Sequence, residues 1–254
     1  MSTTERVIEG LPEETQNLLH AYVKDVKGLF GEQLEGVLLY GSAVRGEFLQ
    51  GRSNLNLLLL VSSYDQALLK GYSAIHRRWS KEQIVAPLFL TEEELRSAAS
   101  VFPLEYLEIQ EQHRVLGGRD PFVGFRVDTQ RLAAEVRQGV VAALLRLRQR
   151  YVEGNATDEA ALILLPLSVT ALLPLLRGVQ RIQGRAVTYQ SDAVINDVAE
   201  LLKLDLQGFH DALLLKRGQI TPGPKEIPRL FERYLQALTA LANRVTVLAP
   251  DGGR

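Results

Sequence analysis

The sequence predicts an α/β domain over residues 1–122, followed by an all-α helical bundle over residues 123–254. Short continuous apolar runs alternate with stretches of helical periodicity only in the first half. From about residue 128 onward, apolar residues recur at helical spacing alone, and residues 116–128 between the two patterns hold three glycines and a proline. Alternating strands and helices indicate an α/β domain, and consecutive helices indicate an antiparallel bundle.

The elements of the first half follow from the spacing of apolar residues. Apolar residues at intervals of three and four predict helices over residues 18–30 and 64–79, and uninterrupted apolar runs predict buried strands over residues 37–40, 55–61 and 84–90. A further helix is expected after Thr91, whose hydroxyl can cap it while Glu94 closes a capping box.

The second half contains only helical signals. Asp128 is expected to cap its first helix, and Thr157 to cap a second one containing the uncharged run 160–176. That run approaches the length of a membrane span. It contains Pro166 and Pro174, however, so the central helix of a bundle is the favoured interpretation. The remaining helices are expected over residues 192–204, 208–215 and 225–248.

Composition excludes several classes of protein. Without cysteine, disulfides, cysteine-ligated metal sites and thiol nucleophiles are excluded. The 29 basic and 30 acidic residues balance, so no nucleic-acid or membrane partner is expected. The halves differ, because residues 1–120 carry 12 basic and 17 acidic residues and residues 121–254 carry 17 and 13. The first ten residues lack the apolar core of a signal peptide, so a cytoplasmic protein is expected.

The most informative motif joins the first two predicted strands. Its first part, residues 38–48, reads LLYGSAVRGEF, and its second, residues 53–61, reads SNLNLLLLV. This order of strand, Gly-Ser turn, Arg-Gly and a second strand resembles the nucleotidyltransferase superfamily related to DNA polymerase beta, including small bacterial aminoglycoside adenylyltransferases. The resemblance covers roughly residues 15–120. It implies a mixed sheet in the first domain and agrees with a helical bundle behind it.

The resemblance implies a role for each matched position. Nucleotidyl transfer depends on positioning the phosphates and neutralising their charge. Gly41 and Ser42 match the phosphate-binding turn, Arg45 belongs to the short helix expected after it, and Asn54 and Asn56 stand where the superfamily carries two metal-binding aspartates. Alternation along a strand places positions 54 and 56 on one face. These five residues form the predicted nucleotide-binding set.

At Asn54 and Asn56 the sequence departs from the superfamily pattern in the residues that would bind the metal ions. Asparagine has nearly the shape of aspartate, but it is neutral, whereas Mg²⁺ is bound mainly through charged carboxylate oxygens. The run 84–90, where the superfamily places a third acid, has none. We therefore assign no metal site and no catalytic residue, and any ATP bound is expected to need Mg²⁺ weakly or not at all.

Three functions remain open at this point. The favoured one is a pseudoenzyme of bacterial type that binds a nucleotide, a small molecule or a protein partner. The second is an active enzyme that transfers AMP from ATP to a small molecule or protein, with Glu47 or Glu105 as the acid. The third is an interaction protein, including a homodimer, whose α/β domain is structural. The four histidines show no metal-ligand spacing.

Overall fold

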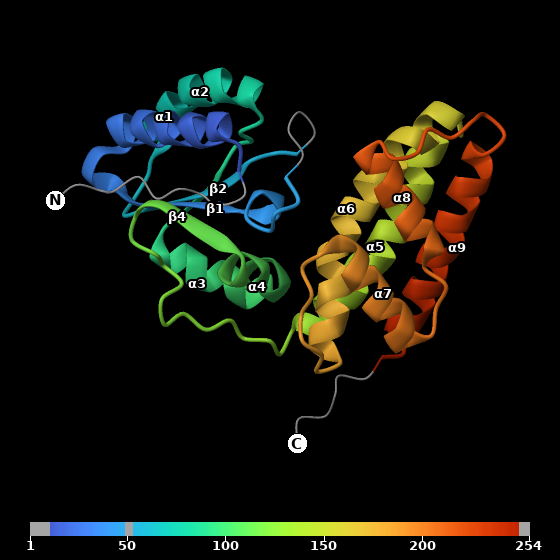
Figure 1. Ribbon diagram of the computed structural model, residues 1–254. Helices are drawn as coiled ribbons and strands as arrows, with labels where there is room; N and C mark the ends of the chain where they lie inside the picture. Colours follow the sequence, from blue (N-terminus) through green and yellow to red (C-terminus); the bar gives the residue numbers. More distant parts are fainter. Residues whose placement is uncertain (1–10, 49–52, 249–254) are drawn as a thin grey trace. The chain divides into compact units, whose positions relative to one another are not determined.

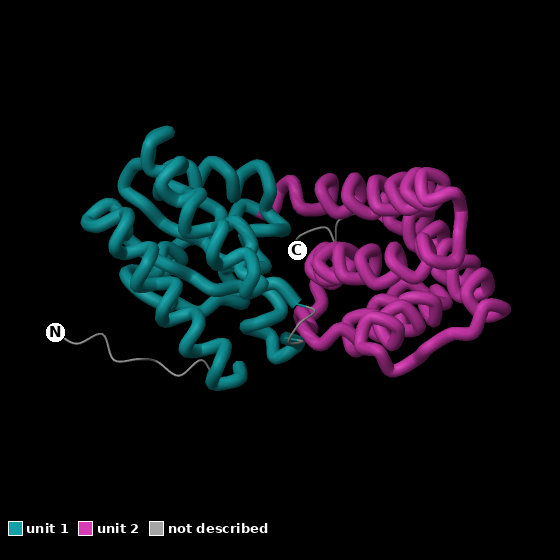
Figure 2. Tube along the Cα trace, turned by 90° about the horizontal axis from the view of Figure 1, so that it is seen from above, with its two compact units in different colours: residues 1–128 teal, residues 129–254 magenta. Residues whose placement is uncertain are grey.

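A computed structural model describes residues 11–48 and 53–248, and it divides the chain into two compact units, Met1–Asp128 and Thr129–Arg254 (Figure 2). This boundary lies a few residues after the division at residue 122 that the sequence suggests. Phe122 is buried in the core of the first unit, together with Leu38 and Leu58. The glycine-rich stretch therefore includes residues that pack as part of the first unit.

The first unit is built on a mixed four-stranded sheet in the order β3-β2-β1-β4. β1 pairs antiparallel with both β2 and β4, and β2 pairs parallel with β3. The strands are β1 (Leu34–Tyr40), β2 (Asn56–Val61), β3 (Leu88–Leu90) and β4 (His113–Gly118). The central strand β1 therefore ends at the Gly-Ser turn with a neighbour on each side.

Helices cover both faces of this sheet (Figure 1). Helices α1 (Glu13–Phe30) and α2 (Gln66–Trp79) lie on one face, and α3 (Glu92–Val101) and α4 (Pro103–Glu111) lie on the other. Because side chains alternate along a strand, Leu57 and Leu59 of β2 enter the first core and Leu58 and Leu60 enter the second. Asn56 has the parity of Leu58, so it belongs to the face covered by α3 and α4.

Two strands differ from the sequence prediction. β4 was not expected, because its sequence HRVLGG offers little apolar alternation. The predicted strand over residues 84–90 is shorter: an isolated bridge joins Ile84 to Leu55, and regular pairing begins only at Leu88, after Pro87. Proline has no N–H for a ladder and is confined to edges and irregular positions, which explains the interruption.

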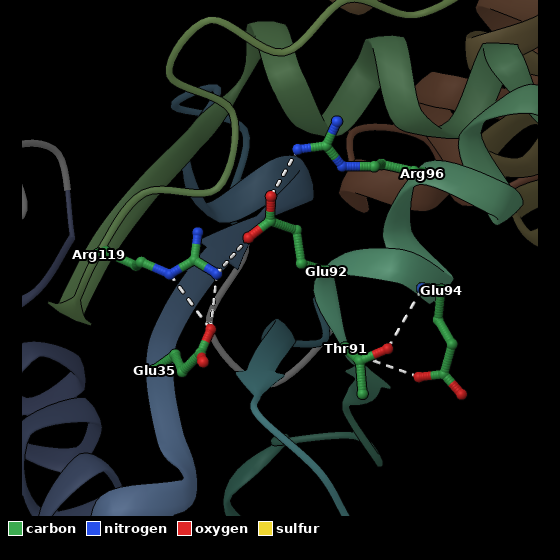
Figure 3. Close-up of polar contacts among 6 residues, drawn as sticks. All are labelled: Glu35, Thr91, Glu92, Glu94, Arg96 and Arg119. Carbon is green, nitrogen blue, oxygen red and sulfur yellow. Dashed lines mark hydrogen bonds and ion pairs between the residues drawn. The ribbon is translucent and has the colours of Figure 1, made fainter.

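Polar contacts fix α3 to the sheet (Figure 3). Arg119, directly after β4, pairs with Glu35 of β1 at 2.6 Å and with Glu92 of α3 at 2.7 Å. The predicted capping box is confirmed, because the Glu94 backbone N–H donates to Thr91 Oγ1 and the Thr91 N–H donates to Glu94 Oε2. Both sets of contacts lie at the first turn of α3, which is therefore the end of the helix that they fix.

The capping box makes part of the stability of the first unit pH-dependent. The backbone N–H of Thr91 lowers the pKa of Glu94, so its stabilisation is present above the unfolded pKa of glutamate and is lost as pH falls through the lowered folded value. We expect Glu94→Ala to cost about 1 kcal/mol at pH 7 and less at pH 4, measured by urea unfolding followed through Trp79 fluorescence. Glu93→Ala, on an exposed neighbour, is the control. Equal losses at both pH values would contradict this account.

The second unit is a helical bundle of five helices within the described residues. They are α5 (Leu132–Glu153), α6 (Asp158–Ile182), α7 (Ser191–Leu202), α8 (Gln207–Arg217) and α9 (Ile227–Thr246). Thr157 caps α6, as predicted, by accepting from the Ala160 N–H. Asp128 does not cap α5, which begins at Leu132 after Arg131 without a side-chain cap.

Helix α6 occupies the centre of the bundle and contacts α5, α7, α8 and α9. Among the described helices it alone is long and apolar enough to pass a length and composition test for a membrane span, a test that core helices also pass. Pro166 and Pro174 lie inside it. The Thr170 hydroxyl donates to the Pro166 carbonyl oxygen, a contact of side chain to the carbonyl four residues earlier that tends to bend a helix.

Candidate functional site

The Gly-Ser turn lies directly after β1 and is one turn of 3₁₀ helix, Gly41–Ala43. Gly41 has a φ of 88°, a conformation that favours glycine. Its carbonyl oxygen accepts from the N–H groups of Val44 and Arg45, so the turn closes tightly on itself. The sequence predicted a short helix after the Gly-Ser turn, and the structure has only this single 3₁₀ turn. In this fold a phosphate would instead meet a tight turn and the half-buried side chain of Ser42.

Asn56 lies against this turn. It is the register partner of Tyr40, the last residue of β1, and a methyl group added at Gly41 would stand 2.7 Å from its Nδ2 atom. A side chain at position 41 would therefore require the Asn56 amide to move. The structure thus places Gly41 and Asn56, two residues singled out from the sequence, next to each other.

Asn54 is exposed, and its neighbours fix its position. The Gln83 side chain donates to the Ser53 carbonyl oxygen at 2.9 Å, and the Leu55 N–H donates to the Gln83 carbonyl oxygen at 2.9 Å. The segment before β2 is therefore anchored on both sides of Asn54. Its side chain remains available to solvent at the same end of the sheet as Asn56.

Arg45 connects the turn to helix α4. Its guanidinium Nη1 lies 4.0 Å from Glu108 Oε2, and both side chains are largely withdrawn from water, with 14% and 10% of their surface exposed. A largely buried arginine with an anionic partner holds its charge in a fixed place. The turn therefore has a positive group beside it, and α4 supplies the carboxylate that orients this group.

A second carboxylate of α4, Glu105, lies near Tyr40. Desolvation raises the pKa of Glu105. Burial, and after it the negative charge of Glu105, raises the pKa of Tyr40 and raises the pKa of Tyr106 to about 12. The Glu105 side chain still keeps solvent contact. Acids near this turn are thus supplied by α4, whereas Asn54 and Asn56 at the start of β2 are neutral. The run 84–90, where the superfamily places its third acid, contains none and gives no sign of the acids on α4.

Other polar groups are dispersed. Among residues 11–48 and 53–248, no three histidine, aspartate or glutamate side chains are grouped as they would be to hold a metal ion. Arg177 on α6 is fully buried, with its guanidinium carbon 5.6 Å from the Tyr189 ring centroid. Helical spacing alone does not distinguish a buried arginine from an exposed one.

Comparison with known proteins supports the fold. The structure is similar to a spectinomycin adenyltransferase, AAD(9) from Enterococcus faecialis, solved with ATP and spectinomycin, with a TM-score of 0.59 and 13% sequence identity over 91% of this chain and 98% of that one. No family model and no curated protein sequence matches the chain. The chain thus has a nucleotidyltransferase-like α/β fold with a mixed sheet, followed by a helical bundle.

Proposed function

We propose that this protein binds a nucleotide at the Gly41–Ser42 turn and does not carry out two-metal nucleotidyl transfer. The position of the Asn56 amide next to Gly41 is the observation that carries this proposal. It places a neutral side chain beside the turn, at the position where the resemblance calls for a metal-binding carboxylate. The fold's likeness to an adenyltransferase solved with ATP supports a nucleotide as the ligand.

The charges around the turn suit a phosphate that arrives without two metal ions. Two Mg²⁺ ions need several carboxylates to hold them, and neither Asn54 nor Asn56 can supply a charge. Arg45 provides one fixed positive charge, which can interact directly with a phosphate oxygen. A nucleotide bound in this way would gain little from added Mg²⁺.

Calorimetric titration with ATP, in Mg²⁺ and again in EDTA, tests this proposal. We expect binding in both conditions, with dissociation constants within about threefold of each other, because no charged metal site would be lost on chelation. Tight binding that strictly requires Mg²⁺ would overturn the proposal. If ATP neither binds nor raises the melting temperature, the protein is instead an interaction protein whose α/β unit is structural.

A substitution at Gly41 tests where the nucleotide binds. Alanine at Gly41 would displace the Asn56 amide, whereas alanine at Gly46 has the same positive-φ strain with no atom within 4 Å of the added carbon. We expect Gly41→Ala to weaken ATP binding by about tenfold and Gly46→Ala to change it by less than about twofold, both by calorimetry. Similar losses in the two variants would attribute the effect to backbone strain and exclude this location.

A second candidate function is favoured by Glu105. A carboxyl with a raised pKa beside the turn is a suitable general base. In this reaction a substrate hydroxyl would attack the α-phosphorus of ATP, pyrophosphate would leave, and Glu105 would accept the hydroxyl proton. Transfer of label from α-labelled ATP to an acceptor, abolished by Glu105→Gln and retained in Glu111→Gln, would support this activity. Pyrophosphate release that persists in Glu105→Gln would exclude Glu105 as the base.

A further inference from the structure

Helix α6 leaves part of its apolar surface uncovered, although it contacts four other helices of the bundle. Only 33% of the residues in its most apolar stretch are buried. Ile163 and Leu167 of α6 are 63% and 56% exposed, and Leu145 and Val152 of the neighbouring helix α5 are 53% and 73% exposed. Single exposed apolar side chains are ordinary, but several on two neighbouring helices indicate a surface that another molecule covers.

The uncovered positions have the spacing of a helix-packing seam. On each helix they recur at alternating intervals of three and four residues, the spacing with which two nearly parallel helices pack. They are Ile163, Leu167, Thr170 and Pro174 on α6, and Gln138, Ala142, Leu145, Gln149 and Val152 on α5, and all are exposed or half-buried. We call these nine residues the outer face. None of them is charged, as is typical of the centre of a protein interface.

The two helices of the outer face run antiparallel in a fixed register. A methyl group added at Gly139 would meet Leu175, and one added at Gly154 would meet Ala160. These two contacts are fifteen residues apart on both helices, from 139 to 154 and from 175 back to 160. Position 149 of α5 is therefore level with position 165 of α6. On each helix, one large exposed apolar residue lies before this level and one after it.

This arrangement makes the outer face complementary to itself. A two-fold axis lying in the plane of the face, at the level of position 149, would place Ile163 against the partner's Leu167. On α5 it would place Leu145 against the partner's Val152. Each contact would occur twice, because a two-fold interface uses the same surface on both copies. The four side chains expose about 400 Å² per chain, and the remainder of the outer face brings this towards the roughly 800 Å² per partner of a standard interface.

The charges that border the outer face agree with the same axis. Arg146 and Glu153 are both exposed on α5 and lie seven residues apart, two turns of helix. Side chains of one helix pair at a separation of three or four residues, so these two are too far apart to pair with each other. The two-fold axis would bring Arg146 within two residues of the partner's Glu153. Each chain thus provides both signs of charge where the other needs them.

We infer that the protein forms a two-fold homodimer through the outer face of α5 and α6. A lipid bilayer is the other surface that could cover apolar side chains. Helix α6 cannot cross a bilayer in this fold, because Leu165, Val169 and Leu172 on its other side are buried in the bundle. A helix lying on a bilayer is typically bordered by basic residues, whereas Arg146 and Glu153 border this one with both signs. The inference does not depend on nucleotide binding.

Sedimentation equilibrium of the whole chain tests the dimer. We expect the average molar mass to rise from that of one chain to that of two, with a dissociation constant of about 10 μM, as suits an interface at the small end of the range. Leu167→Glu should raise this constant at least about tenfold, because it adds a charge on each side of the axis. Leu69→Glu, at an exposed apolar position of α2, is the matched control and should change it by less than about twofold.

A chain that stays monomeric up to about 100 μM would overturn the inference. If that monomer also floats with vesicles of phosphatidylcholine and phosphatidylglycerol, a bilayer and not a second copy covers the outer face. Equal weakening by Leu167→Glu and Leu69→Glu would place the dimer interface elsewhere.

A charge exchange tests the two-fold register and does not require a charge in the apolar centre. We expect Arg146→Glu and Glu153→Arg each to raise the dissociation constant about threefold at low salt, because each places like charges together across the axis. The double variant restores opposite charges and should return the constant to within about twofold of the original. Losses that multiply in the double variant would contradict the pairing of Arg146 with the partner's Glu153, and with it this dimer.

Discussion

Replacing both asparagines with aspartate, in the double variant Asn54→Asp, Asn56→Asp, is expected to create Mg²⁺-dependent nucleotide binding. Aspartate has nearly the same shape, so the contact with Gly41 is retained while two negative charges are added at one end of the sheet. We expect ATP affinity in Mg²⁺ to exceed that in EDTA by at least about tenfold, compared with about threefold or less before the change. Calorimetry in the two conditions measures both ratios.

Asn17→Asp is the matched control for this experiment. It makes the same chemical change on the exposed surface of α1, which lies on the face of the sheet opposite α3 and α4. Any Mg²⁺ effect that it shares with the double variant reflects general charge. If the double variant binds ATP equally well in Mg²⁺ and in EDTA, positions 54 and 56 are not a lost metal site and the site assignment fails.

Gly208→Ala is expected to destabilise the helical bundle by about 1–3 kcal/mol. The added carbon would stand 2.7 Å from both the backbone nitrogen and the Cα of Tyr234 in α9. Backbone atoms of a packed helix cannot turn aside, so α8 must separate from α9. Tyr234 is fully buried and its hydroxyl donates to Ser168 of α6 at 2.8 Å, so the displacement also reaches the central helix. Urea unfolding followed by far-ultraviolet circular dichroism measures the loss.

The control is Gly28→Ala in α1, where nothing lies within 4 Å of the added carbon. Alanine there is expected to stabilise the first unit by about 0.5–1 kcal/mol, because glycine loses more backbone freedom on entering a helix. Trp79 is the single tryptophan and lies in the first unit, so its fluorescence reports that unit. A gain from Gly208→Ala resembling that from Gly28→Ala would show that α8 and α9 have room to accommodate the methyl group.

The sequence was a good guide to elements with strong local signals. The capping box at Thr91 and Glu94 and the cap at Thr157 depend on residues three positions apart, and both appear as expected. β4 could not be anticipated, because its pairing with β1 comes from a segment far along the chain and its two glycines resemble a loop. The cap expected at Asp128 failed because α5 begins only at Leu132, after the extended and turn residues that follow the first unit.

The candidate site was predictable only in part. The motif indicated Gly41, Ser42, Arg45, Asn54 and Asn56, and alternation along β2 fixed the face that Asn56 occupies. The sequence offered Glu105 as one of two possible acids, but it did not indicate Glu108 or the position of α4, because both residues resemble ordinary helix-surface acids. Their proximity to the turn arises from tertiary packing of α4 beside the end of β1.

The order of strands in the sheet has a consequence for biosynthesis. β1 and β2 are made early and can pair as soon as both are synthesised, but β4, which covers the other edge of β1, follows only after α2, β3, α3 and α4. During translation the most apolar strand pair of the protein therefore waits with an uncovered edge, a state that invites pairing with other nascent chains. Ribosomal pausing before residue 118 would prolong this exposure.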